Sequence, residues 1–517
     1  MNIVHSLAVV TALALVGNSH AQDLSLEMKG GGVGQTLTVS IDGATGQGYL
    51  LLMSTQYTPT ALPAPHVSPI DVGLDLLGPS VTVPGFVGLT PANIVYPIPD
   101  DPTLDGVTLN FQALRVNGPV LDAKSNPWRL TFSDPEEWHE SLEDSFLSRA
   151  LLTATPLADG TVLLAGGTPS IGPYSGGSAM FTTTPGASTA ELYHPGLEAF
   201  EVLPNMAQGR ARHVATTLAD GRVLITGGSN GIQSLKSAEI YDPQTKSFTA
   251  TGSMADGRIG HSATLLQDGR VLVAGGSTVG THQLSIAQNA LATTEFFDPQ
   301  TGLFTPGPGM FLPRTFHSAD LVPDGRVVFA GGFSSLNGAG YTLSSIMTWN
   351  PNGGIGGFLN LTSLQKPRAC HASLLLHDGR VMILGGIELT AGQLQTTSSV
   401  LATKSIERID PLIPSAGHIG SIASEVMFPH VIVLENDDIL LAGGQYGTGV
   451  YDAPLDSVSL YRAHIGNGGW FHTGHLVSER SGGVAAALPD GTAAVFHGFT
   501  WQKAMLKNAE IYQPNPK

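Results

Sequence analysis

Residues 218–228 read LADGRVLITGG, and variants of this phrase return six more times along the 517-residue chain. The copies lie about 50–60 residues apart and share a tight turn, an apolar strand and a closing glycine pair. The other copies are LADGTVLLAGG at 157–167, LQDGRVLVAGG at 266–276, VPDGRVVFAGG at 322–332, LHDGRVMILGG at 376–386, ENDDILLAGG at 435–444 and LPDGTAAVFHG at 488–498. A repeat of this length, built from a hairpin and a buried strand, predicts an all-β protein with a seven-bladed β-propeller.

Further shared positions predict four strands in each blade. Asp-Gly pairs such as Asp220-Gly221 suit the two-residue hairpin between the first two strands, because glycine adopts a positive φ readily. An R-x-x-H pattern precedes this hairpin at Arg210 and His213, Arg258 and His261, Arg314 and His317, and Arg368 and His371, and we align the sixth copy on Met427 and His430. A phrase such as AEIYDP at 238–243 marks the third strand, and an aromatic residue about ten positions before the next arginine marks the fourth.

The two ends of the repeat region predict how the ring closes. The phrase AEIYQP at 509–514 supplies the third strand of the last blade. Its fourth strand is expected from Trp138–Leu142, which begins eleven residues before Arg149. Pairing the two ends in this way removes exposed strand edges.

The region before the repeats predicts export and a separate domain. An apolar run from Leu7 to Gly17 is followed by Ser19-His20-Ala21, so residues 1–21 read as a signal peptide cut after Ala21. The protein is therefore expected to be secreted or periplasmic. Stretches with alternating polarity at 36–41, 80–85 and 107–111 predict a small β-sandwich over residues 22–135, ahead of the propeller at 136–517.

Composition limits the partners. The net charge of −17 argues against nucleic acid, because binding phosphates requires clustered lysine and arginine. No segment after the signal peptide is apolar enough to cross a bilayer, so membrane insertion is not expected. The single cysteine, Cys370, excludes an intrachain disulfide, and the mature protein is expected to be a monomer.

The double glycine, the R-x-x-H pattern and the Tyr-Asp-Pro strand together resemble the Kelch repeat. The DGRVLVAGG form is similar to the central propeller of the galactose oxidase family, and the resemblance covers Trp138–Lys517. A copper-radical oxidase of that family would need a tyrosine directly before a first-strand histidine. The residues at those places are Arg212, Gly260, Phe316 and Cys370, with Pro429 before His430. None of them is a phenol, so no metal, other cofactor or catalytic residue is assigned.

Two repeated residue types invite a structural interpretation. The histidines recur once per blade, too far apart around a ring to share a metal ion, so each is expected to make a local hydrogen bond. Five arginines recur in blades whose third strand carries a glutamate. These pairs are Arg149 and Glu191, Arg210 and Glu239, Arg258 and Glu295, Arg368 and Glu407, and Arg480 and Glu510. They are predicted to form buried ion pairs across the glycines, whereas blade four has Met347 and blade six has Met427 and Ser459 at the equivalent places.

The loops after the second and fourth strands share one face and vary in length, as binding loops on a repeated scaffold do. Aromatic residues in these loops are candidate ligand-binding residues, with anchoring of their own loops as the alternative. The candidates are Tyr174, Tyr341, Tyr446, Tyr451 and Trp501. We expect a non-catalytic module that binds a polysaccharide or a surface protein on this long-loop face. The alternative is a carbohydrate-active enzyme of the galactose oxidase-like or sugar mutarotase kind, for which Glu479 and the repeat histidines offer acid–base groups.

Overall fold

The computed structural model describes defined parts of the chain. Before residue 132 these are the strands named below. From there on they are residues 138–171, 185–279, 283–351, 357–389, 401–413, 415–434, 437–447, 452–462, 469–500, 502 and 504–514. Most of the described residues belong to β-strands, as the sequence predicted.

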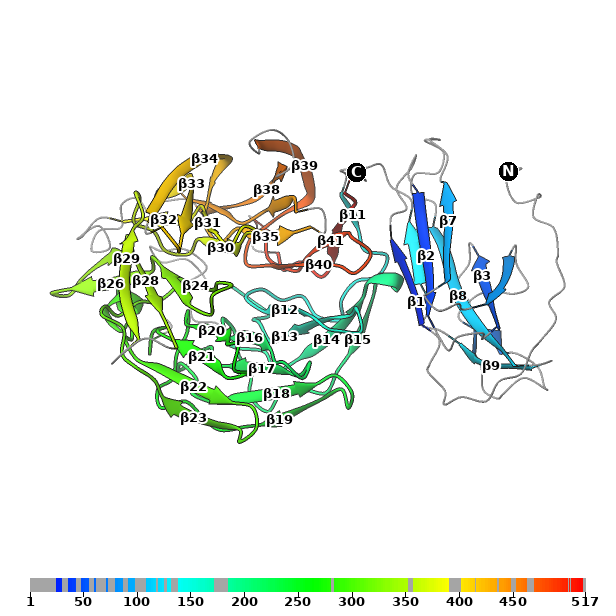
Figure 1. Ribbon diagram of the computed structural model, residues 1–517, viewed down its shortest axis with the longest axis horizontal. Helices are drawn as coiled ribbons and strands as arrows, with labels where there is room; N and C mark the ends of the chain where they lie inside the picture. Colours follow the sequence, from blue (N-terminus) through cyan, green and yellow to red (C-terminus); the bar gives the residue numbers. More distant parts are fainter. Residues whose placement is uncertain are drawn as a thin grey trace.

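Seven antiparallel sheets are arranged around a central axis, which confirms the propeller (Figure 1). From the inside outward, blade one contains β12 (Thr153–Pro156), β13 (Val162–Ala165), β14 (Ala190–His194) and β15 (Ala199–Val202). Blade two contains β16 (Val214–Thr217), β17 (Val223–Thr226), β18 (Ala238–Asp242) and β19 (Ser247–Ala250). Blade three contains β20 (Ser262–Leu265), β21 (Val271–Ala274), β22 (Thr294–Asp298) and β23 (Leu303–Pro306).

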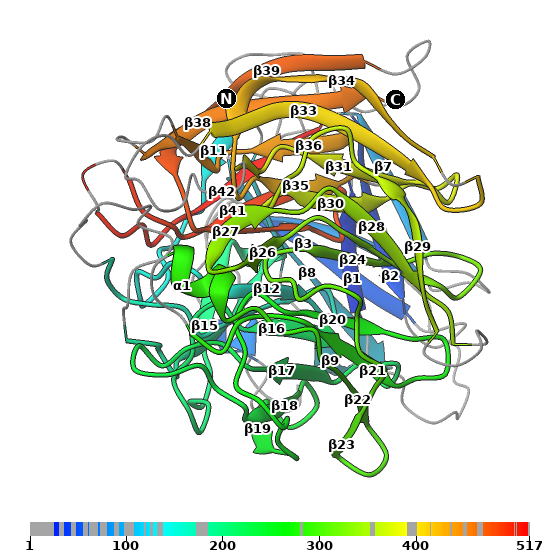
Figure 2. The same cartoon turned by 90° about the vertical axis from the view of Figure 1, so that its left-hand side faces the viewer.

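Blades four to six follow the same order with longer outer strands in blades five and six. Blade four contains β24 (Ser318–Leu321), β25 (Val327–Ala330), β28 (Ser345–Trp349) and β29 (Phe358–Ser363). Blade five contains β30 (Ala372–Leu375), β31 (Val381–Leu384), β33 (Leu401–Asp410) and β34 (Ser415–Val426). Blade six contains β35 (His430–Val433), β36 (Ile439–Ala442), β38 (Asp452–Arg462) and β39 (Gly469–Arg480). The long outer strands of blades five and six lie side by side in Figure 2.

The ring closes through the two ends of the propeller, as predicted. Blade seven contains β40 (Val484–Ala487), β41 (Ala493–Phe496), β42 (Ala509–Tyr512) and, as its outermost strand, β11 (Trp138–Glu140). In the pairing of β11 with β42, Trp138 lies opposite Tyr512, and the centroids of the two rings are 5.4 Å apart. Each first strand also contacts the first strand of the next blade, and β40 contacts β12, so the first strands form the inner wall.

The glycine pair allows neighbouring blades to approach closely. A Cβ on Gly227 would lie 2.5 Å from the carbonyl oxygen of Arg258 and 2.7 Å from Cε1 of His261, both in the next blade. Gly228, the second glycine, donates its N–H to that same arginine carbonyl at 3.0 Å. The equivalent bond is made at all seven blade junctions, from Gly167 to Arg210, Gly276 to Arg314, Gly332 to Arg368, Gly386 to Val426, Gly444 to Arg480 and Gly498 to Arg149. The glycines are therefore required by the next blade as well as by their own turn.

The predicted arginine–glutamate pairs are confirmed in all five blades. Nη2 of Arg210 lies 2.7 Å from Oε1 of Glu239, and both side chains are almost completely buried. The same arginine donates through Nη1 to the carbonyl of Gly227 at 2.8 Å. Glu239 also accepts the backbone N–H of Ala207 at 2.7 Å, which holds the segment that enters the blade. The other pairs are Arg149–Glu191, Arg258–Glu295, Arg368–Glu407 and Arg480–Glu510.

The alignment of blade six differs from the prediction by one residue. Met427 forms the bridge to Gln445 that Ala211 forms to Ser229, so Val426, and not Met427, occupies the arginine position. Pro429 then stands at the histidine position, and His430 begins β35 instead. The prediction followed the only nearby histidine, whereas the register is determined by the backbone hydrogen bond from Gly386 to Val426, at 2.8 Å.

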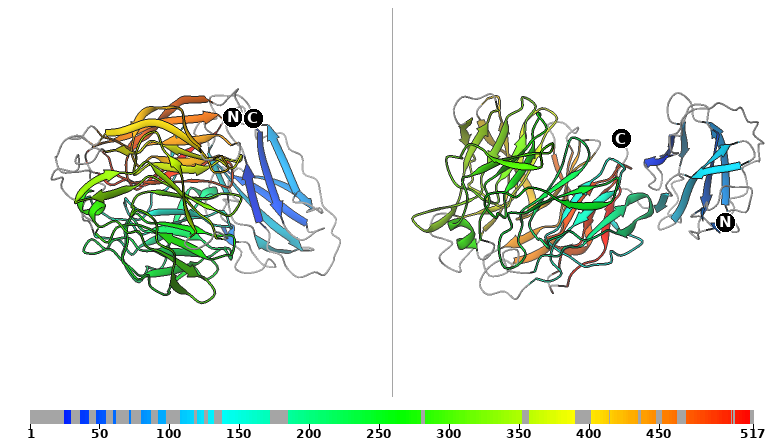
Figure 3. Two further views of the ribbon diagram at one scale, coloured as in Figure 1. Left: turned by 60° about the vertical axis from the view of Figure 1, so that its left-hand side comes forward. Right: turned by 90° about the horizontal axis from the view of Figure 1, so that it is seen from below.

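The N-terminal strands lie to one side of the propeller (Figure 3). They form a three-stranded sheet of β1 (Ser25–Lys29), β2 (Thr36–Asp42) and β7 (Ala92–Pro97); a five-stranded sheet of β10 (Trp128–Thr131), β8 (Thr108–Asn117), β3 (Gly48–Ser54), β6 (Ser80–Phe86) and β9 (Val120–Lys124); and the short pair β4 (Thr60–Ala61) and β5 (Asp71–Val72). The three alternating stretches fall in β2, β6 and β8, while the sandwich and its boundaries stay predictions. Within the described part of the chain, no helix is long and apolar enough to span a membrane.

The buried ion pairs yield a stability prediction. Replacing Arg210 by Met leaves the Glu239 carboxylate buried without its cation, so the free energy of unfolding should fall by about 3–5 kcal/mol. The control is Arg222→Met, which removes an exposed partner 2.7 Å from Asp220 and should cost less than about 1 kcal/mol. Urea unfolding of both variants checks the difference, and equal losses would contradict a structural role for the buried pair.

Candidate functional site

One residue per blade lies in the left-handed backbone region and faces the propeller axis. We call these seven residues the inner ring; each stands two positions after the arginine position. They are Leu151, Arg212, Gly260, Phe316, Cys370, Phe428 and Gly482, with φ between 50° and 65°. Five of them are not glycine, and such residues usually cost about 1–2 kcal/mol each in this conformation. Strain repeated at equivalent places indicates that the surrounding structure imposes it.

Backbone hydrogen bonds connect the inner ring from blade to blade. Arg212 donates its N–H to the carbonyl of Leu151 at 3.0 Å, and Leu151 donates to Gly482 at 2.7 Å. Equivalent bonds join Phe316 to Gly260, Cys370 to Phe316 and Phe428 to Cys370, at 2.7, 3.1 and 2.9 Å. Five of the seven inner-ring N–H groups thus bind a carbonyl of the preceding blade, and these bonds fix the backbone that carries the side chains.

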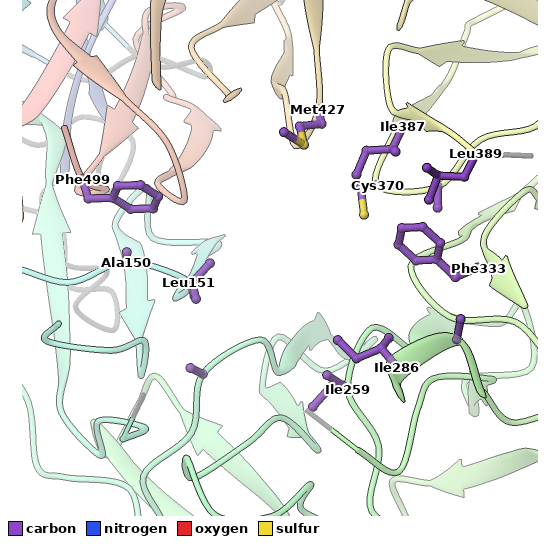
Figure 4. Packing of buried hydrophobic residues seen from close by; sticks show 13 residues of the cluster. Ala150, Leu151, Ile259, Ile286, Phe333, Cys370, Ile387, Leu389, Met427 and Phe499 are labelled. Atoms are coloured by element: carbon purple, nitrogen blue, oxygen red, sulfur yellow. The ribbon is translucent and has the colours of Figure 1, made fainter. Parts of the chain in front are cut away.

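These side chains line a cavity of about 350 Å³ on the propeller axis. Inner-ring members and the repeat histidines make up most of its wall, including Leu151, Arg212, Phe316, Cys370 and Phe428. Apolar residues from the long loops pack behind the ring, and Figure 4 shows several of them encircling a central opening. Loop residues in this cluster include Ile286, Phe333, Ile387, Leu389 and Phe499. The inner ring is therefore backed by the long loops on the side where these loops leave the blades.

Arg212 places a positive charge in this largely apolar wall. Burial lowers the pKa of its guanidinium to about 10, which still leaves it protonated at neutral pH. Burial raises the pKa of the Cys370 thiol well above its usual value, against a smaller opposing effect of Arg212, so this cysteine is neutral. The wall thus combines two phenylalanine rings, one guanidinium and a neutral thiol.

The repeat histidines are neutral structural groups. Burial lowers the pKa of His213, His261 and His371 to about 3. Nε2 of His213 lies 3.0 Å from Oγ1 of Thr153 in the preceding blade, and His317 makes the same contact with Ser262 at 3.1 Å. The predicted hydrogen bond is therefore confirmed for these two, and it is wrong for His371, whose buried ring nitrogens have no hydrogen-bond partner among the described residues. His261 is bonded instead to Thr226, because its equivalent partner is a valine.

The loops of blades three to five form a connected rim. Helix α1 (Gln283–Gln288) contacts the hairpin of β26 (Phe333–Leu336) and β27 (Ala339–Thr342), and Gln288 donates to the carbonyl of Gly338 at 2.7 Å. Oγ1 of Thr342 donates to the carbonyl of Leu389 at 2.9 Å and accepts the N–H of that residue at 3.0 Å. Leu389 follows β32 (Ile387–Glu388), so these side-chain bonds hold the loops of blades four and five together.

Two of the five predicted ligand-binding aromatics belong to the described part of the chain, and neither lines the cavity. Tyr341 on β27 and Tyr446 on β37 (Gln445–Gly447) are half-buried loop residues of blades four and six and are not among those that line the cavity. Tyr174, Tyr451 and Trp501 lie outside the described residues. Sequence reasoning missed the inner ring, although one signal was present. The residue two positions after the repeated arginine differs from each blade to the next.

The inner ring does not fit a copper-radical centre. Such a centre needs phenols and accessible imidazoles, whereas the ring positions before the repeat histidines carry Arg212, Phe316 and Cys370, besides a glycine. Across the described ranges, no group of three or more His, Cys, Asp or Glu side chains is arranged to hold a metal ion.

Comparison with known proteins supports the fold. Residues 210–255 match the family described as Kelch motif. A solved fungal alcohol oxidase, described as having catalytic diversity among the AA5 family and in complex with copper, is 15% identical with a TM-score of 0.57, over 73% of this chain and 76% of that one. The structure of YjhT is 14% identical with a TM-score of 0.43, over 72% of this chain and 96% of that one. None of the curated proteins matches the sequence. The chain thus contains a Kelch-type propeller like that of the galactose oxidase family, and the likeness concerns the fold alone.

The histidine pKa values yield a pH prediction. In the unfolded chain a histidine has a pKa near 6.5, so between pH 6.5 and 3 the unfolded state binds protons that the native state excludes. Stability should therefore fall as the pH drops below 6.5, by about 2 kcal/mol at pH 5 for each histidine whose native pKa is about 3. Burial also raises the pKa of two carboxyls, that of Asp320 to about 6 and that of Asp490, and both groups oppose this trend.

Urea unfolding of His261→Gln at pH 7 and pH 5 tests the sign. The variant should lose less stability on acidification than the unmodified protein, because one excluded proton is gone. The matched control is His377→Gln, since the side chain of His377 is 79% exposed. An unchanged pH dependence in His261→Gln would show that this histidine is not held neutral.

Proposed function

We propose that the protein is an exported, non-catalytic binding module whose axial cavity takes a carbohydrate. The observation that carries this proposal is the composition of the cavity wall: aromatic faces and one cationic donor, held on a hydrogen-bonded ring. A volume of about 350 Å³ lies at the lower end of the range typical of small-ligand pockets. It suits a compact sugar unit better than the flat surface of a protein.

The side chains offer the two kinds of contact that sugar recognition uses. Phe316 and Phe428 belong to blades four and six, on either side of Cys370, and their ring centroids lie 6.1 Å apart in an edge-to-face arrangement. Aromatic rings pack against the apolar face of a sugar, while the guanidinium of Arg212 can donate to hydroxyl or ring oxygens. Because the inner-ring backbone is already fixed, little conformational entropy would be lost on binding.

The same wall supports binding over catalysis. Acid–base chemistry on a sugar needs a pair of titratable groups near neutral pKa. The described residues that line the cavity include no carboxylate, and the pKa values of His213, His261 and His371 are too low for proton transfer at neutral pH. Glu479, weighed as an acid–base candidate, is likewise not among the lining residues.

The experiment uses glycine substitutions in the inner ring. Phe316→Gly and Phe428→Gly remove the aromatic faces. Glycine adopts the positive φ of these positions without strain, so the only expected loss of stability is that from the missing side-chain packing. On a glycan array, each variant should bind the glycans recognised by the unmodified protein about tenfold more weakly. Lys246→Ala, which breaks an exposed pair with Glu201, is the control and should bind normally.

Other outcomes separate the alternatives. Full affinity in both phenylalanine variants would overturn the cavity as the binding site, and Tyr341→Ala and Tyr446→Ala would then test the loops of blades four and six. Chemical conversion of a bound glycan would overturn the non-catalytic assignment. Binding to no glycan, together with capture of one defined surface protein that Arg212→Gly abolishes, would replace the carbohydrate with a protein partner.

A further inference from the structure

Blade four retains a buried arginine without the carboxylate that accompanies it elsewhere. Arg314 is 0% exposed, and the arginines of the five paired blades are 0–1% exposed. Its guanidinium donates only to neutral groups: the carbonyl of Gly331 at 3.1 Å, and the carbonyl and Oγ of Ser345 at 3.4 and 3.1 Å. Met347 stands at the glutamate position and is also fully buried. Within the described residues, no carboxylate lies within ion-pair distance of Arg314.

The paired blades show what the missing carboxylate does. In blade five, Glu407 lies 2.5 Å from Nη2 of Arg368. It also accepts the backbone N–H groups of Gln365 at 2.6 Å and Lys366 at 3.1 Å, which stand three and two positions before the arginine. Blades two and seven repeat this arrangement with two N–H groups each. Each such carboxylate is therefore enclosed by a guanidinium and two backbone donors.

The donors are retained in blade four. Phe311 and Leu312 stand three and two positions before Arg314, and their backbone N–H groups have no acceptor in the described part of the chain. The two residues are 57% and 38% exposed, so solvent reaches this segment. Among residues 138–517, the acidic residues whose side chains lie outside the described part are Glu435 and Asp452, and both belong to blade six in the sequence. The described residues therefore offer blade four no replacement for the carboxylate.

We propose that blade four contains a binding site for a small monovalent anion, of the chloride class, held by Arg314 and by the backbone N–H groups of Phe311 and Leu312. A buried guanidinium without a counter-charge is costly, and an anion from solution supplies that charge. Backbone N–H groups and a guanidinium are the donors that commonly bind anions. Methionine is unbranched and flexible, so Met347 can share the space that a glutamate would fill.

A halide is favoured over a larger anion because the site lies inside a blade. The carboxylate group that it replaces is small, Met347 at the glutamate position is fully buried, and Oγ of Ser345 already accepts from Nη2 of Arg314 at 3.1 Å. This site serves stability, and it is independent of ligand binding in the axial cavity.

Thermal unfolding in matched sodium salts tests the proposal. The melting temperature of the purified protein should be higher in 0.3 M chloride than in 0.3 M gluconate, by about 1–3 °C. Met347→Glu supplies the missing carboxylate within the chain, so the variant should melt higher in gluconate and lose the difference between the salts. Met347→Gln has the same shape without the charge and should retain that difference.

Two results would overturn the proposal: equal melting temperatures of the unmodified protein in the two salts, or a full chloride effect in a folded Met347→Glu variant. Should Met347→Glu fail to fold, crystals of the unmodified protein soaked in bromide decide the question. An anomalous peak within hydrogen-bonding distance of Nη2 of Arg314 supports the site, and a map without such a peak excludes it.

Discussion

The structure depends on the hydrogen bond from the second glycine of each blade to a backbone carbonyl of the next. This bond occurs at all seven junctions, including the one from Gly498 to Arg149 that closes the ring. Around Gly227, the first glycine of its pair, the two backbones approach more closely than a Cβ would allow. At the closing junction His497 takes the place of that first glycine, with a φ of 55°. The glycine pair is consequently the most regular feature of the repeat, and the carbonyl that accepts the bond positions everything that follows it in the next blade.

The inner ring follows from this contact. Two residues after the accepting carbonyl, the chain turns into the left-handed region and presents one side chain per blade to the axis. The backbone there is nearly identical in every blade, yet the side chains range from glycine to arginine. The same strained backbone thus presents different side chains around one cavity. The residues that stabilise the fold are therefore distinct from those available for binding.

The buried ion pairs illustrate how far the blades can diverge. Five blades neutralise their arginine with a glutamate, blade six has neither group, and blade four keeps the cation alone. The persistence of the arginine without its partner indicates that its hydrogen bonds to the glycine carbonyl and to the third strand matter in their own right. Such pairs define where the strands lie, although a well-packed apolar pair could match their stability.

The amino-acid sequence by itself determined the seven blades, the closure through Trp138 and Tyr512, and the arginine–glutamate pairs, because each rests on local patterns that repeat. It could not determine the register of blade six, where His430 suggested one alignment and a hydrogen bond between distant residues selects another. Nor could it identify the axial cavity. Leu151, Phe316 and Phe428 are far apart in the chain and belong to no motif. Only the closing of the ring brings their side chains to a common axis.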